Sequence, residues 1–211
     1  MSALFLKNCY DKKLKKLFTY LFLIFFSFSA SSYADDISDF QIEGISIGDS
    51  LLDYFSEKEI KEQIKKHKYI YQYTTDEFGE VYKFEGLETY QMLSFFVKPD
   101  DNNFTIYAIF GTLPHEKDMN SCYKKMSEIS KEFSVKFKDT EKRSGTNTHA
   151  VDTTGRSTAK EVNFRFKSGD AIRIICTDFE ESLRIEKGWI DGLDIAIQSK
   201  EVSDWLRKRI N

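Results

Sequence analysis

The stretch TYQMLSFFVKPDDNNFTIYAIFG, residues 89–111, decides the fold class of this chain. Two apolar runs, Thr89–Lys98 and Phe104–Gly111, flank a short segment of Pro, Asp and Asn residues, a composition typical of a β-hairpin turn. Apolar side chains occupy both faces of each run, as expected for central strands that are covered on both sides. The stretch therefore predicts two paired strands in the middle of an antiparallel sheet.

Helices are predicted on both sides of this hairpin in the sequence. A capping box, Ser56 with Glu59, starts a helix that extends to about His67. Apolar residues recur at steps of three and four through Lys117–Phe137, which predicts the longest helix. A closing helix follows Ser199, a residue type that often caps a helix N-terminus.

Further strands are predicted at Val81–Glu85, Glu161–Lys167, Ala171–Asp178 and Gly192–Gln198. The element order is then α-βββ-α-βββ-α, which indicates an α+β fold with a mainly antiparallel sheet packed against helices. Two arrangements fit this order. In one, residues 35–211 form a single domain whose sheet carries all strands, with the helices on one face. In the other, an αβββ unit is duplicated, with a boundary in residues 138–160. The single domain is favoured because hairpin-linked strands tend to be neighbours.

The first 34 residues have the three parts of a cleaved signal peptide. Five Lys residues precede an apolar run, Leu17–Phe28, of about 12 residues, whereas a membrane-spanning helix needs roughly 20. Ser32 and Ala34 are the small residues that a signal peptidase requires, so we expect cleavage between Ala34 and Asp35. The mature protein is then periplasmic or secreted, with no stable membrane insertion. A retained membrane anchor is the alternative.

Removal of this segment leaves an acidic chain. Five of the 31 Lys and Arg residues and one of the 34 Asp and Glu residues lie in residues 1–34, so the mature chain has a net charge of −7. Binding to nucleic acid phosphates needs clustered cations. We therefore expect the partner to be a protein or a small-molecule ligand, and not a nucleic acid.

Export also bears on the cysteines, because Cys122 and Cys176 are the two that remain in the mature chain. Cys122 lies on the apolar stripe of the longest predicted helix, and Cys176 shares a strand face with Ile172 and Ile174. In an oxidising compartment we predict a disulfide between the two cysteines. Two separate buried thiols are the alternative.

Several segments resemble a known protein family: Ile42–Ser50, Tyr54–Ile60, Cys122–Met126 and Cys176–Asp178. Over most of its mature part the chain is similar to small, signal-bearing exported proteins of marine bacteria with compact genomes. The resemblance implies export. Since that family has no assigned activity, it supplies no catalytic residues.

No motif predicts catalytic residues, a metal site or a cofactor. The Ser-x-x-Lys pairs that begin at Ser121 and Ser157 lack the partner motifs of penicillin-recognising enzymes. The three His residues lack a second ligand at the spacing of a zinc site.

Residues 140–160 are rich in Ser, Thr, Gly and Asn and have no periodicity, which predicts a long loop that is either functional or mobile. Within it, His149, Asp152 and Arg156 form a candidate site. We expect a non-enzymatic binding or interaction protein that uses this loop or one face of the sheet. The alternative is a periplasmic hydrolase, or another small-molecule enzyme, that uses the three loop residues.

Overall fold

The structure is a computed structural model, and it describes residues 37–67, 75–115, 118–149, 152 and 154–208. The chain divides into two units, Met1–Tyr33 and Ala34–Asn211, and the described residues all belong to the second. The predicted signal peptide and its cleavage site between Ala34 and Asp35 lie outside the described residues. The fold is therefore that of the second unit.

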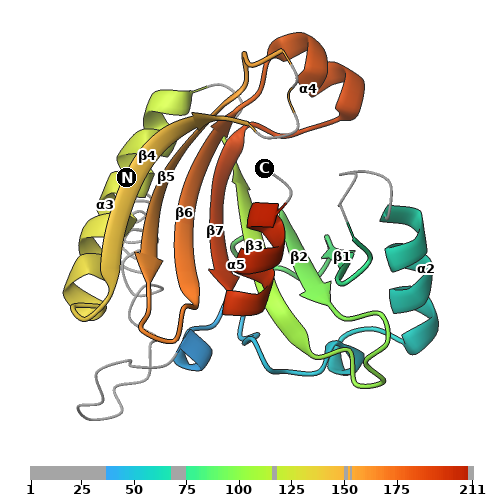
Figure 1. Cartoon of the computed structure of the whole chain (residues 1–211). Coiled ribbons are helices and arrows are strands. Elements are labelled where there is room, and N and C mark those ends of the chain that lie inside the picture. The colour runs from blue at the N-terminus through green and yellow to red at the C-terminus, as the bar shows by residue number, and fades with distance from the viewer. Residues whose placement is uncertain (1–36, 68–74, 116–117, 150–151, 153, 209–211) are drawn as a thin grey trace, which may run out of the picture. The chain divides into compact units, whose positions relative to one another are not determined.

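The described part of this unit is built on one antiparallel sheet of seven strands (Figure 1). Their order across the sheet is β1-β2-β3-β7-β6-β5-β4. The strands are β1 Gly79–Lys83, β2 Met92–Val97, β3 Ile106–Pro114, β4 Glu141–Thr148, β5 Thr158–Arg165, β6 Ala171–Asp178 and β7 Gly192–Gln198. Because β3 pairs with β7, the strands from both halves of the chain lie in a single sheet. The α+β class is confirmed.

Helices lie on both faces of the sheet. They are the short 3₁₀ helices η1 Ile37–Asp39 and η2 Leu51–Asp53, and the α-helices α2 Glu57–His67, α3 Met119–Lys136, α4 Glu181–Lys187 and α5 Lys200–Lys208. Figure 1 shows α3 along one face of the sheet, α5 across the other and α4 at one end. The prediction that all helices lie on one face is therefore wrong for α5.

One face of the sheet, called the α3 face below, carries the main hydrophobic core. Side chains alternate along a strand, so Ile174 of β6 and Ile195 of β7, which are paired, both point to this face. The helix α3 contacts β6 and β7 and covers them with Met126 and Ile129, which are buried. Burial of this apolar stripe is what fixes the longest helix against the sheet.

A disulfide joins Cys122 of α3 to Cys176 of β6, as predicted. Both residues are fully buried. Their Cα atoms are 6.1 Å apart, which is within the range that a disulfide requires. The bond therefore ties the longest helix covalently to the sheet.

The opposite face, called the α5 face below, has a smaller apolar cluster. Val202 and Trp205 of α5 pack against Phe78, Phe96 and Ala108. Phe96 and Ala108 lie on β2 and β3, whose other faces belong to the main core. Since both faces of these two central strands are apolar, the face turned away from the main core also needs a cover, and α5 supplies it.

The predicted loop at Thr140–Lys160 is mostly a β-hairpin. The strand β4 pairs with β5 along its whole length, from Glu141 opposite Arg165 to Thr148 opposite Thr158, so the connection covers only residues 149–157. Every residue of β4 is exposed, because β4 is the edge strand of the sheet. An exposed edge strand needs no apolar alternation, and the pattern that predicts strands therefore missed it.

Candidate functional site

Of the three predicted loop residues, Asp152 has a structural role within its own turn. Its carboxylate accepts hydrogen bonds from the backbone N–H groups of Thr154, Arg156 and Ser157, at 2.7, 3.1 and 2.6 Å, and from the Thr154 hydroxyl at 2.6 Å. These bonds, that of the Thr154 hydroxyl first, hold the pKa of Asp152 well below its usual range. A carboxylate so fully occupied is not available as a general base.

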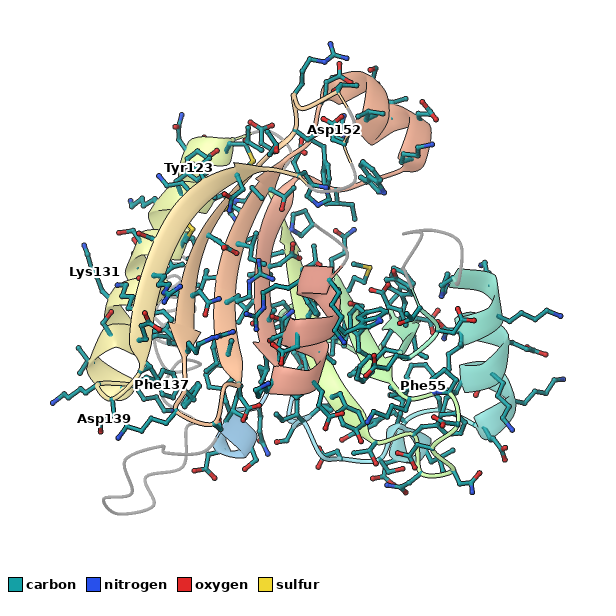
Figure 2. All side chains as sticks on the ribbon, viewed as in Figure 1. Phe55, Tyr123, Lys131, Phe137, Asp139 and Asp152 are labelled. Carbon is teal, nitrogen blue, oxygen red and sulfur yellow. A yellow bond between two sulfur atoms is a disulfide. The ribbon has the colours of Figure 1, made fainter. Side chains whose placement is uncertain are left out.

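His149 and Arg156 tie the turn to the segment beside α4 and do not converge on a common point. The His149 ring packs against Phe179 and Trp189, with ring centroids 4.8 and 6.0 Å apart. The Arg156 guanidinium lies 3.4 Å from the Glu180 carboxylate. Figure 2 shows Asp152 beside α4, at one end of the sheet. The three residues therefore anchor the connection between β4 and β5.

The first Ser-x-x-Lys pair is not an activated nucleophile. His115 Nδ1 lies 2.8 Å from Ser121 Oγ, which resembles a serine–histidine pair. The same hydroxyl lies 2.7 Å from the Asp118 carbonyl oxygen. A carbonyl can only accept, so the single hydroxyl proton goes to Asp118 and His115 donates to the hydroxyl oxygen. An imidazole in that role cannot take the serine proton.

The second Ser-x-x-Lys pair is also structural. Ser157 is fully buried, and its hydroxyl accepts the backbone N–H of Glu180 at 2.9 Å. The Lys160 ammonium lies over the ring of Tyr123, 4.9 Å from its centroid. The serine and the lysine therefore have different partners.

A polar row crosses the α5 face where the sequence predicted no site. It consists of Thr112 of β3, Asp194 of β7, Arg173 of β6 and Glu161 of β5, which are consecutive strands of the sheet. Each alternates with residues that point to the α3 face. In the strand register Thr112 lies opposite Asp194, while Ile175 lies opposite both Asp194 and Glu161. The row is thus assembled by strand pairing.

Hydrogen bonds connect the polar row in two pairs. Thr112 donates its hydroxyl to Asp194 Oδ1 at 2.5 Å. Arg173 donates Nε–H to Glu161 Oε2 at 3.1 Å, and a second guanidinium nitrogen donates to the same oxygen. Two of the five N–H groups of Arg173 are bonded to Glu161, while among the described residues Asp194 has only a neutral hydroxyl as a hydrogen-bond donor.

Asp194 is the unusual member of the polar row. Burial raises its pKa to about 6, against the opposing effects of the Thr112 hydrogen bond and the Arg173 charge. The residue is only partly buried and so remains in contact with solvent. A carboxylate with a perturbed pKa on a rigid sheet, within reach of a guanidinium charge, is typical of a functional site.

The position of the row is defined by the elements around it. Figure 1 shows α5 crossing one part of this face and α4 standing at the end where β6 stops and β7 begins. Asp194 is the third residue of β7 and so lies near that end. Ser94 and Thr177 are other polar residues on the α5 face, and both are buried. The row therefore lies on the stretch of sheet between the two helices.

Sequence reasoning missed the row because its members are far apart in the chain, yet two of them left a local signal. Arg173 interrupts the apolar run Ala171–Ile175, and Asp194 stands between Leu193 and Ile195. A charge inside an otherwise apolar strand costs free energy unless it has a partner or a role. That signal marks single residues, and it does not say which of them meet.

Scans of the chain against protein-family models, curated proteins and solved structures found no match. Among the described residues no three His, Cys, Asp or Glu side chains are grouped to hold a metal ion. Within the same residues no helix has the length and apolar character that crossing a membrane requires.

Proposed function

We propose that this chain is an exported, non-enzymatic binding protein that holds a small polar ligand on the α5 face, at the polar row. The observation that carries the proposal is the row itself. Four polar side chains from four adjacent strands lie on one sheet face as two hydrogen-bonded pairs, and one of them, Asp194, forms no ion pair with any residue that the structure describes. Polar groups placed on rigid strands are suited to orient a ligand.

Binding is favoured over the hydrolase alternative by the state of the loop residues. Asp152 is occupied by donors from its own turn, and Arg156 pairs with Glu180. In the polar row, Glu161 is held by Arg173. An activated nucleophile next to a base is therefore absent from these two groups of described residues.

Export is part of the proposal and is supported by two observations. The N-terminal sequence has the basic, apolar and small-residue parts of a signal peptide. The disulfide between Cys122 and Cys176 is of the kind that persists in oxidising compartments. Mass spectrometry of the exported protein should find Asp35 at the N-terminus, within one or two residues. An intact Met1 in a membrane fraction would contradict export.

The binding proposal is tested with a panel of small cationic, anionic and neutral compounds, observed through the backbone amide signals of the protein by NMR. We expect a bound compound to shift the signals of β3, β7, β6 and β5 at the polar row. Thr112→Val removes one hydroxyl from the row and should weaken binding. Thr146→Val makes the same change on the exposed edge strand β4 and should not.

Two results would contradict the proposal. In one, bound compounds shift only signals away from the α5 face, or bind Thr112→Val and Thr146→Val equally well. In the other, a compound is consumed during the measurement, which would favour the enzyme.

A further inference from the structure

We propose that the ligand of the polar row is a small organic cation with N–H donors, of the class of primary amines. The inference rests on the proposed function and names the chemical class of the ligand.

The charges of the row do not balance. It holds two carboxylates, Asp194 and Glu161, and one guanidinium, Arg173. The guanidinium donates twice to Glu161, so the excess negative charge resides on Asp194. A carboxylate that is partly withdrawn from water gains most from a positive charge placed directly beside it. A cationic ligand supplies that charge.

Both carboxylates of the row have one oxygen that accepts no hydrogen bond from a described residue. Within the described part of the chain, the Thr112 hydroxyl donates to Asp194 Oδ1, and no donor is bonded to Asp194 Oδ2. Asn163 lies two residues beyond Glu161 on the same face of β5, opposite Arg173. Its side-chain carbonyl oxygen is buried and has no hydrogen-bond partner in that same part of the chain. A ligand that brings donors satisfies such groups, and a primary ammonium has three.

An anionic ligand fits the row poorly. An anion bound to the N–H groups of Arg173 that Glu161 leaves free would be a third negative group around one guanidinium. The charges of Asp194 and Glu161 would repel such an anion. A neutral ligand leaves the charge of Asp194 unmatched. The overall charge of the mature chain, −7, also attracts cations toward the surface.

The test compares three probes of similar size: butylammonium chloride, sodium butyrate and 1-butanol. Each is titrated into the protein purified from expression of the whole chain, with binding followed by NMR. We expect butylammonium to shift the signals of the polar row, and the other two probes to leave them unchanged. Tetramethylammonium carries the charge without N–H donors and should bind more weakly than butylammonium.

Asp194→Asn keeps the shape of the side chain and the acceptor for Thr112 while it removes the charge. It should lower the affinity for butylammonium by about tenfold or more, the loss expected for one partly buried ion pair. Asp100→Asn makes the same change at an exposed position in the hairpin between β2 and β3 and should leave the affinity unchanged. The NMR spectrum without probe shows whether each variant is folded.

The outcomes separate this inference from the proposed function. If butyrate or butanol binds the row as well as butylammonium, and Thr112→Val weakens that binding, the row is a ligand site but the cation assignment is wrong. Equal butylammonium binding by Asp194→Asn and the unaltered protein also overturns the inference. If no compound of the wider panel shifts the row, both the inference and the proposed function fail.

Discussion

Asp194→Asn should make the protein more stable at neutral pH, and the gain should depend on pH. The pKa of Asp194 is raised by burial from 3.8 to about 6 in the folded state. A tenfold change in proton affinity corresponds to about 1.4 kcal/mol. The difference between the two pKa values therefore corresponds to about 3 kcal/mol of stability that is lost when the buried carboxylate ionises.

The sign follows from which state binds the proton more tightly. Between pH 3.8 and about 6 the folded protein holds a proton on Asp194 that the unfolded chain has released. The contribution of this group is therefore fully present below pH 3.8 and is lost as the pH rises through about 6. Asn cannot ionise, so the variant keeps this contribution to stability at every pH. The two proteins should be about equally stable near pH 4, and the variant should be more stable by up to about 3 kcal/mol at pH 8.

Urea unfolding, followed by tryptophan fluorescence between pH 4 and pH 8 with the disulfide intact, measures this difference. The contribution of all other titrating groups to the pH dependence of stability cancels when the variant is compared with the unaltered protein at each pH. Asp100→Asn, at an exposed position, controls for the loss of a charge as such. A variant that is less stable at pH 8, or a difference that does not change with pH, would refute the reasoning, since Asp194 would then be compensated by its surroundings.

Three further predictions concern the fold. Replacement of both Cys122 and Cys176 by Ala should lower the free energy of unfolding by at most about 4 kcal/mol, the chain-entropy value for a sequence separation of 54; no loss would show that the bond does not form in solution. Gly192→Ala should destabilise by about 1–3 kcal/mol in thermal unfolding, because the new Cβ would lie 2.4 Å from the Leu113 carbonyl oxygen; an unchanged melting temperature would contradict the close approach of β3 to β7. Limited trypsin digestion, read by mass spectrometry, should cut after Arg156 before Lys142 or Arg143, because those two residues lie in β4 and are paired with β5; first cleavage inside β4 would mean that the edge strand opens easily.

Much of the fold could be predicted from local pattern. The bounds of α2, β6 and β7 agree with prediction, because capping residues and apolar patterns act over a few neighbours in the chain. The two-sided apolar character of residues 89–111 correctly indicated central strands. Cys122 and Cys176 each stood on an apolar face, and the predicted disulfide is present. In each case the local residues alone carry the information.

Other elements could not be predicted in this way. The strand β4 has no apolar pattern, and it is a strand because β5 offers a free edge to pair with. The short helix α4, which begins after Glu180 and ends before Gly188, was also missed, since it has no buried residue and so lacks an apolar stripe. Both elements depend on what lies next to them in the folded chain.

The candidate site shows most clearly which features depend on local sequence and which depend on the tertiary structure. The sequence by itself determined an α+β chain with two-sided central strands, an apolar α3 face and a cysteine pair suited to a disulfide. It directed attention to His149, Asp152 and Arg156 because they are close in sequence, and the structure shows that they hold a turn. Only the tertiary structure brought Thr112 next to Asp194, 82 residues apart. Strand order and register are set by burial and pairing over the whole sheet, and no short stretch of sequence contains that information.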